Sequence, residues 1–322
     1  MGLKGYVVKK ILIGIPLIIG IMTFNFILIH LAPGGPLASF ASPRITPHAR
    51  QILLQEFGLD KPLPVQYYLY LVNIFHGNLG QSYFWAEPVS TLILQRLPAT
   101  ILLTGTSTIL AILIGVPLGV LAATRPRSKT DRAITGLSIL GYSMPVFWLG
   151  LIFLVVFAAY FHVLPSGGML SLNSSSNVFA VLPDLLTHMI LPVLTLMIVS
   201  LAPFILFTRA GMIEALSKDY VLAAKAKGAS RFRVLYRHAL RNGLLSVFTV
   251  IGLSLAFVVA GSVLVETVFS WPGIGLLLYQ AISYRDYPVL LGSFLIIAIS
   301  VFAINLVTDI VYAFLDPRIS YD

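Results

Sequence analysis

Long stretches without Lys, Arg, Asp or Glu alternate with short polar segments along the chain. These uncharged stretches cover residues 11–43, 97–124, 133–183, 185–208, 242–265 and 287–308. A helix needs roughly 20 mostly apolar residues to cross a bilayer. The longest stretch could hold two helices, but turn-forming residues at 165–168 and 173–177 interrupt it. The pattern therefore predicts six spans, at about residues 9–31, 98–123, 134–161, 188–208, 244–266 and 289–313.

A further uncharged stretch, residues 267–284, carries the sequence Trp271-Pro-Gly-Ile-Gly275 at its start. Proline and glycine at this spacing interrupt a spanning helix. We therefore expect an interfacial or re-entrant segment here, with a seventh span as the alternative.

Composition agrees with a membrane protein. Hydrophobic residues make up 58% of the 322 residues, charged residues 10%, and the mean hydropathy is +0.93. Soluble domains carry about 25% charged residues, so a soluble globule is excluded. The chain has no cysteine, which excludes disulfides, thiolate nucleophiles and zinc–thiolate sites.

The formal charge of +9 alone could indicate a nucleic-acid partner, but the positions of the 21 Lys and Arg residues indicate membrane orientation. With the N-terminus inside, 16 of them fall on the inner side and five on the outer side. Because Lys and Arg accumulate in cytoplasmic loops, we expect both termini to be cytoplasmic. The first apolar run exceeds the roughly 7–15 residues of a signal peptide, so we interpret it as a retained anchor.

The predicted spans divide the chain into three parts: residues 1–32, an extracytoplasmic segment 33–96, and a core 97–322 with the other five spans and the loop 209–243. The middle segment is too short for a robust core of its own. Apolar residues at helical spacing after Pro62 and Pro64 predict a short helix at about 65–76. We interpret this segment as a helical cap, or alternatively as a surface that receives an external partner.

The loop 209–243 has the richest pattern. Two short helices are expected to meet at Gly228, the residue best able to adopt a positive φ. One face of the second helix is apolar, and Arg233, Arg237 and Arg241 form a basic stripe beside it. This pattern fits an amphipathic loop lying on anionic lipid equally well as a surface that docks a cytoplasmic partner.

Several short motifs, in a consistent order, resemble those of dipeptide/oligopeptide ABC transporter permeases, in particular the first permease subunit. In the loop, the resemblance is carried by residues 219–228 and by His238-Ala-Leu-Arg-Asn242. The other matching motifs are Phe57–Pro62, Gly77–Gly80, Gly141–Pro145, Glu266–Gly275, Arg285–Pro288 and Leu315–Ile319. The resemblance implies an all-α membrane protein with six transmembrane helices and the type I ABC importer permease architecture.

The resemblance also implies a function and a set of partners. The chain would form half of a translocation pathway that imports dipeptides or oligopeptides by alternating access in a prokaryotic cell membrane. Its partners would be a second homologous permease, as a heterodimer, two cytoplasmic ATPase subunits and an extracytoplasmic substrate-binding protein. Related permeases carry oligosaccharides, nickel chelates or glutathione, and these substrates remain alternatives.

The resemblance assigns ATPase coupling to the loop. The residues concerned are Asp219, Tyr220, Ala223, Ala224, Ala226, Lys227 and Gly228. Three departures from the family pattern stand out. Leu222 occupies the usual acidic position, His238–Arg241 replaces an Ile-x-Leu-Pro motif, and Ser246 stands where a proline is common.

Enzymatic activity is not expected. A P-loop needs Gly-Lys-Ser/Thr, and the chain contains no Gly-Lys dipeptide, so ATP and Mg²⁺ would be bound by the partner ATPases. The six histidines show no metal-ligand spacing. An intramembrane hydrolase and an ATP-independent secondary transporter are the alternative classes; the latter would predict internal repeats and charges at the midplane.

Four residues are candidates for the pathway or its outer gate: Glu266, Trp271, Ser254 and Ser262. Small residues on the fifth span suit either a passage for zwitterionic peptides or tight helix packing. Glu266 could equally be an interfacial charge. For Asp309 we expect a partner permease or a loop arginine as the neighbour, with a proton relay as the alternative. Gly115 and Gly119 predict close contact with another helix.

Overall fold

The computed structural model describes residues 3–32, 58–171 and 178–315. These residues fold into helices joined by turns, and the one β pairing among the described residues is an isolated bridge between Gln81 and Pro88. The chain divides into two compact units. Unit 1 comprises residues 1–98 and 273–322, and unit 2 comprises residues 99–272.

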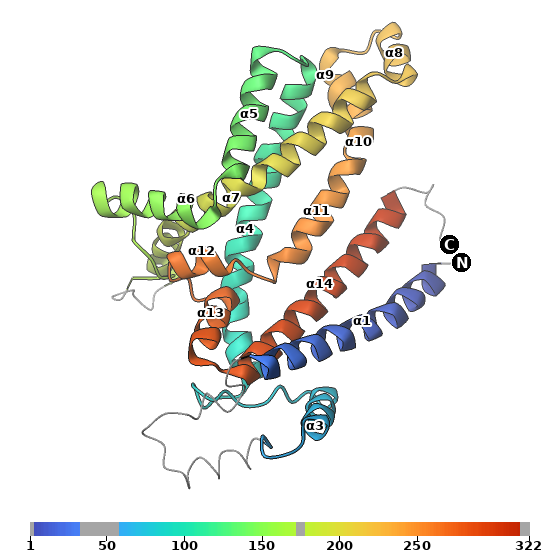
Figure 1. The fold of residues 1–322 in the computed structure, drawn as a ribbon. Helices are drawn as coiled ribbons and strands as arrows, with labels where there is room; N and C mark the ends of the chain where they lie inside the picture. The colour runs from blue at the N-terminus through green and yellow to red at the C-terminus, as the bar shows by residue number, and fades with distance from the viewer. Residues whose placement is uncertain (1–2, 33–57, 172–177, 316–322) are drawn as a thin grey trace. The chain divides into compact units, whose positions relative to one another are not determined.

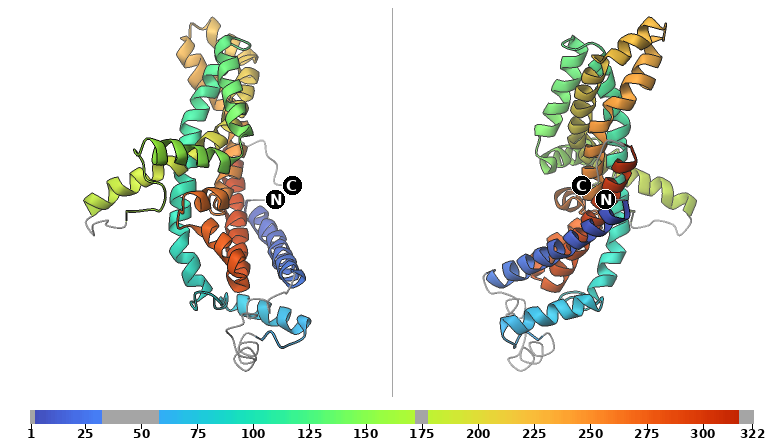
Figure 2. Two further views of the ribbon diagram at one scale, coloured as in Figure 1. Left: turned by 60° about the vertical axis from the view of Figure 1, so that its left-hand side comes forward. Right: turned by 90° about the vertical axis from the view of Figure 1, so that its right-hand side faces the viewer.

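The part of unit 1 that the structure describes contains four helices and the start of a fifth (Figure 1). They are α1 (Leu3–Leu31), α3 (Leu63–Phe75), α13 (Ile274–Tyr284), α14 (Tyr287–Leu315) and the first residues of α4 (Val89–Thr124). Helices α1 and α14 lie side by side in both orientations of the molecule (Figures 1 and 2). The helix predicted after Pro62 and Pro64 is confirmed as α3, and residues 33–57 of the predicted external segment lie outside the described residues.

Unit 2 contains the remainder of α4 and a series of helices that pack around it. They are α5 (Lys129–Ser143), α6 (Val146–Phe153), η2 (Leu154–Tyr160), α7 (Val178–Leu216), α8 (Asp219–Ala226), α9 (Arg231–Arg233), η3 (Val234–Ala239), α10 (Leu240–Gly243), α11 (Leu245–Val258) and α12 (Val263–Val268). The most extensive helix pairing is that of α5 with α7, which run side by side (Figure 2).

Among the described residues, four helices are long and apolar enough to cross a membrane: Gly5–Leu31, Val89–Thr124, Val181–Leu216 and Tyr287–Val311. Two bent helix pairs bring the number of spans to as many as six. This range includes the six spans that the hydropathy pattern predicts. Because α4 has 36 residues and a helix rises about 1.5 Å per residue, it is longer than the roughly 30 Å hydrocarbon core and extends beyond it.

The third predicted span, 134–161, is not one continuous helix. The chain bends by 96° between residues 129–143 and 146–160. Met144 adopts an extended conformation, with φ −76° and ψ 132°, directly before Pro145. Proline disfavours helical geometry in the residue that precedes it, and this preference accounts for the position of the bend.

The fifth predicted span, 244–266, is also divided. Helix α11 ends at Val258, Gly261 takes a φ of +74°, and α12 begins at Val263. The following segment, 267–284, is confirmed as interrupted, because α12 ends at Val268 and α13 begins only at Ile274.

Helices α4 and α7 approach closely at the two glycines of the sequence pattern, as predicted. A Cβ atom on Gly115 would lie 2.8 Å from Phe204 Cβ, and one on Gly119 would lie 2.6 Å from Thr208 Cβ and 2.7 Å from the Ile205 carbonyl oxygen. Real Cβ atoms do not approach other atoms so closely. The missing side chains therefore allow the helix contact.

We predict that Gly119→Ala lowers the stability of the purified chain by about 1–3 kcal/mol, since an added methyl group overpacks this contact. Gly136→Ala is the matched control, because nothing lies within 4 Å of its Cβ position on α5 and alanine favours a helix. Thermal unfolding in detergent would compare the two variants. Equal melting temperatures would contradict the packing role of Gly119.

In unit 1, helix α3 packs on the end of α1. The hydroxyl groups of Thr23 and Tyr67 lie 2.5 Å apart, and His30 Nε2 lies 3.1 Å from Gln66 Oε1. The ring of Phe26 on α1 stacks on the ring of Tyr70 on α3. The short external helix is therefore attached to the first span by polar and aromatic contacts.

Asp309 has a different neighbour from those expected. Its Oδ2 accepts a hydrogen bond of 2.9 Å from Lys10 Nζ, which joins α14 to α1 within unit 1. An ion pair reduces the large cost of a charge in a membrane helix. The pair therefore explains why α14 tolerates an aspartate.

Candidate coupling loop and buried gate cluster

The loop 209–243, called the coupling loop below, folds as two helical arms joined at Gly228. Gly228 has a φ of +77°. Its N–H donates to the Lys225 carbonyl at 3.0 Å, and the Ala229 N–H donates to the Ala224 carbonyl at 3.1 Å. These two bonds form a Schellman motif, which ends α8 and needs a left-handed residue at this position. The predicted turn is confirmed.

The two arms pack on each other through a small apolar cluster. Val221 and Ala224 of α8 are buried against Val234 of η3, with Leu216 and Ala229 around them. Ala224, expected to contact an ATPase, is only 8% exposed. Its methyl group faces the second arm of the loop itself, and the coupling role that the resemblance assigns to Ala224 stays a prediction.

The other six expected coupling residues lie at the surface. They are Asp219, Tyr220, Ala223, Ala226, Lys227 and Gly228. Large apolar side chains are exposed beside them: Leu222 is 59% exposed, Phe232 70% and Tyr236 45%. The rings of Phe232 and Tyr236 lie 4.4 Å apart. We call Tyr220, Leu222, Phe232 and Tyr236 the exposed apolar patch of the loop.

The structure divides the apolar stripe of the second arm. The sequence pattern placed Phe232 and Tyr236 on one apolar face with Leu235, Ala239 and Leu240. In the structure only the latter three turn toward the protein, and Ala239 is completely buried. The switch to π-helical turns over Val234–Ala239 changes the angular spacing that the pattern assumed.

The second arm of the loop is anchored to the ends of the long helices. Ala239 packs with residues of both α4 and α7, including Val120 and Met212. A Cβ atom on Gly243 would lie 3.1 Å from the backbone of Gly211. The second arm of the loop is therefore packed directly against both α4 and α7.

A buried ion pair lies at the base of the same region. Arg209 Nε donates to Asp131 Oδ1 at 2.6 Å, and Arg209 Nη2 donates to Asp131 Oδ2 at 2.8 Å. The backbone N–H of Arg127 donates to the same carboxylate at 2.7 Å. Asp131 is 3% exposed. This two-point contact holds α5 against α7, and sequence reasoning missed it.

Glu266 and Trp271, two of the gate candidates, lie in the interior of unit 2. Both are completely buried. Thr100 Oγ1 donates to Glu266 Oε1 at 3.2 Å, and the Ser262 N–H donates to the same oxygen at 3.3 Å. The interpretation of Glu266 as an interfacial charge is therefore wrong, because its carboxylate connects α12 to α4.

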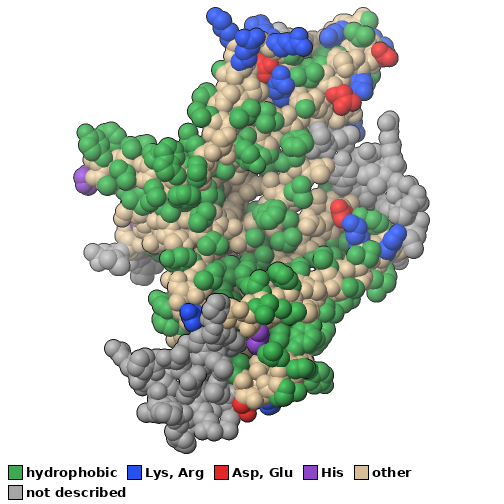
Figure 3. All heavy atoms as spheres, in the orientation of Figure 1, with side chains coloured by type: hydrophobic (Ala, Val, Ile, Leu, Met, Phe, Trp, Pro, Cys, Tyr) green, Lys and Arg blue, Asp and Glu red, His purple; other side chains and the backbone are tan. Residues whose placement is uncertain are grey.

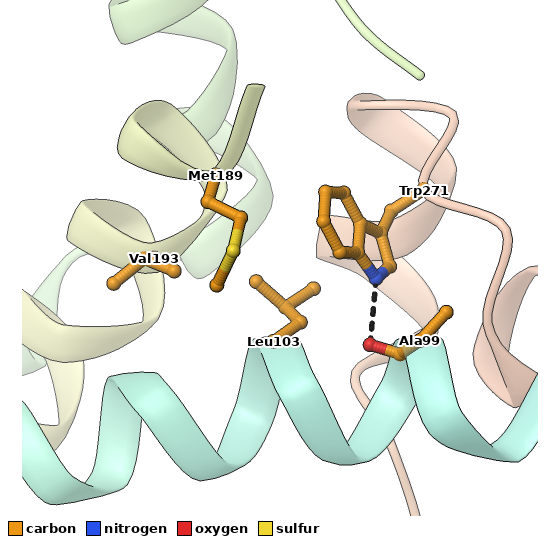
Figure 4. Close-up of a cluster of buried hydrophobic side chains, with 5 residues drawn as sticks. All are labelled: Ala99, Leu103, Met189, Val193 and Trp271. Carbon is orange, nitrogen blue, oxygen red and sulfur yellow. Dashed lines mark hydrogen bonds between the residues drawn. The ribbon is translucent and has the colours of Figure 1, made fainter. Parts of the chain in front are cut away.

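The Trp271 side chain belongs to the same buried cluster (Figure 4). Its Nε1 donates to the Ala99 carbonyl at 2.8 Å, and its ring packs with Leu103, Met189 and Val193. Three of the gate candidates thus lie together beside Ala99 and Thr100 of α4: Glu266, Ser262 and Trp271. Ser254 lies half-buried on the separate helix α11.

We predict that Glu266→Gln keeps most of the stability of the chain, because its amide oxygen can still accept both hydrogen bonds. Glu266→Leu should cost about 1–3 kcal/mol, since it leaves buried donors unsatisfied. Thermal unfolding in detergent measures both. Equal losses in the two variants would contradict a hydrogen-bonding role.

Within the three described ranges, no three His, Asp or Glu side chains come together as ligands of a metal ion would. The site thus consists of a helical loop with an exposed apolar patch and a buried polar cluster that connects α12 to α4.

Comparison with known proteins extends over nearly the whole chain. Residues 115–321 match the family described as binding-protein-dependent transport system inner membrane component, and residues 3–104 match the N-terminal family of such membrane components. The oligopeptide transport system permease protein AppB of Bacillus subtilis is 41% identical over 320 residues, 99% of this chain and 100% of its own. The dipeptide transport system permease protein DppB of Escherichia coli K12 is 38% identical over 334 residues, 98% of each chain.

Solved structures share the fold at lower identity. The MetNI methionine ABC transporter in an inward-facing conformation matches with a TM-score of 0.56 and 18% identity, covering 70% of this chain and 97% of the matched one. An amino acid ABC transporter crystallised with histidines matches with a TM-score of 0.50 and 15% identity, covering 71% and 95%.

Proposed function

Because this chain belongs to the family of membrane components of binding-protein-dependent transport systems, we propose that it is the permease subunit of an ATP-driven importer of dipeptides or oligopeptides. The observation that carries the proposal is the full-length similarity, at 38–41% identity, to permeases named for dipeptide and oligopeptide transport. The matches cover the whole of those relatives rather than one shared segment.

The proposed assembly contains a second permease subunit, two ATPase subunits and a substrate-binding protein. This chain would then form half of the pathway, and ATP hydrolysis would take place on the partner ATPases. The absence of a Gly-Lys dipeptide from the complete sequence supports this division.

The exposed apolar patch of the coupling loop supports the docking of an ATPase. Exposed apolar side chains clustered on one surface mark interaction sites, and aromatic residues dominate the binding energy of many protein interfaces. The loop is also anchored to α4 and α7 through Ala239. Movement of a docked ATPase would therefore act on these two helices.

The buried cluster around Glu266 supports a structural role in the pathway. It holds α12 and the following turn against α4 by hydrogen bonds to Thr100 and Ala99. Opening of a passage beside this cluster would require these hydrogen bonds to break, or α12, the following turn and α4 to move as one body. We therefore assign the cluster to the wall that supports the gate, rather than to the lining of the passage.

Uptake by intact cells tests the proposed function. Deletion of this chain should abolish uptake of a radiolabelled dipeptide or tripeptide, while uptake of the free amino acid stays unchanged. Expression of the wild-type chain from a plasmid should restore uptake. Unchanged peptide uptake, with loss of nickel chelate or glutathione uptake instead, would contradict the peptide substrate and leave the transporter class intact.

A further inference from the structure

A cavity of about 530 Å³ lies in unit 2, where the coupling loop joins the ends of α4 and α7. This volume falls within the roughly 300–1,000 Å³ of small-molecule sites. Most of its lining is apolar and comes from both long helices and both arms of the loop. The lining includes Ala123, Ile213, Leu216, Val234 and Leu235, with Lys225 as its single charged side chain.

The cavity lies at the end of two membrane-spanning helices. Ala123 is next to the last residue of α4, and Leu216 is the last residue of α7, both within helices that qualify as spans. The cavity therefore lies at the end of both helices that adjoins the Lys- and Arg-rich segments. Its apolar lining favours an apolar occupant, such as a lipid acyl chain, over water.

The charge around the cavity is strongly positive. All 12 Lys and Arg residues of unit 2 fall within residues 125–132 and 209–241, and Figure 3 shows blue side chains gathered at this end of unit 2. Two of the three acidic residues in these segments are already paired: Asp131 with Arg209, and Glu214 with Lys218. Lys225 takes part in none of the ion pairs among the described residues, and its side chain lines the cavity and is exposed.

We propose that this cavity binds an anionic phospholipid of the surrounding bilayer. Its acyl chain would lie against Ile213, Leu216 and Leu235, and its phosphate would pair with the Lys225 ammonium group. An apolar cavity with one cation, in a part of the chain rich in Lys and Arg, matches both the acyl chain and the phosphate of this lipid. A soluble anion would leave the apolar lining exposed to water, and a zwitterionic lipid would gain less from the positive charge of these segments.

A bound lipid would contact α4, α7 and both arms of the coupling loop at once. It would therefore stabilise the arrangement of the loop relative to the spans. The inference is independent of the transported substrate, because it rests on the cavity and its charge alone.

Native mass spectrometry of the full-length chain, purified in detergent and incubated with defined lipids, tests the proposal. The probes are phosphatidylglycerol and phosphatidylcholine with identical acyl chains. The wild type should retain phosphatidylglycerol in excess, and Lys225→Gln should reduce that retention about fivefold, as expected for one lysine near an anionic headgroup. Lys218→Gln, a lysine of the same loop that does not line the cavity, should match the wild type.

A second variant tests the apolar part of the cavity without touching charge. Ala229 lines the cavity, and Ala229→Leu should reduce the retention of both lipids by filling the space. Equal retention of the two lipids by the wild type, or equal effects of Lys225→Gln and Lys218→Gln, would overturn the proposal. Displacement of the lipid by inorganic phosphate would also overturn it, since the site would then belong to a soluble anion.

Discussion

Replacement of Arg209 by methionine should destabilise the chain by about 3–5 kcal/mol, the largest loss of stability that we expect from a single substitution here. It leaves the carboxylate of Asp131 buried without its cation, and an uncompensated buried charge is strongly destabilising. Both guanidinium contacts, at 2.6 and 2.8 Å, would be lost together. Thermal unfolding in detergent and the amount of inserted protein measure the effect.

Two further variants make this prediction specific. The double variant Arg209→Met with Asp131→Leu should recover much of the loss, because apolar replacement of a whole buried pair is often neutral. Arg132→Met is the matched single control, since Arg132 is exposed one residue from Asp131. A loss in Arg132→Met as large as that in Arg209→Met would show that the ion pair is not the cause.

Replacement of Gly228 by valine should reduce peptide uptake about tenfold or more while the chain still inserts. A left-handed residue with a side chain costs about 1–2 kcal/mol, and each 1.4 kcal/mol corresponds to about a tenfold change in an equilibrium. The φ of +77° would be strained, and the hydrogen bonds that end α8 would weaken. The exposed apolar patch would then lose its fixed geometry.

Gly228→Asn is the matched variant, because asparagine tolerates the left-handed conformation and no atom lies within 4 Å of the Cβ position. It should keep most of the uptake. Co-purification of ATPase subunits provides a second measurement, with reduced recovery for valine and near-normal recovery for asparagine. Normal uptake with Gly228→Val would contradict the coupling role of the turn.

Hydropathy predicted the spans well. Burying a charge in lipid is costly, so Lys, Arg, Asp and Glu are largely confined to positions outside the spans. It did not predict the internal breaks equally well. Pro145 is a visible signal for the 96° bend, but membrane helices often tolerate proline when neighbours satisfy the freed backbone. Whether a proline kinks a helix or divides it depends on those neighbours.

In the candidate site, too, some features could be predicted from the sequence and others depended on neighbouring helices. Local spacing placed the turn at Gly228 and the two arms of the loop, and the α8–η3 contact decided that Ala224 faces inward while Leu222 faces outward. The face of a short helix that is buried depends on which element packs against it. An eight-residue helix such as α8 carries too few turns for its own pattern to decide.

Residues close together in the chain were therefore enough to establish the membrane class, the approximate spans, the glycines at close contacts and turns, and the family resemblance. The tertiary structure alone decided the polar pairings. Arg209 meets Asp131 across 78 positions, Thr100 meets Glu266 across 166, and Lys10 meets Asp309 across 299. Such pairs form because a buried charge or hydrogen-bonding group must find a partner, and helix packing determines which one is within reach.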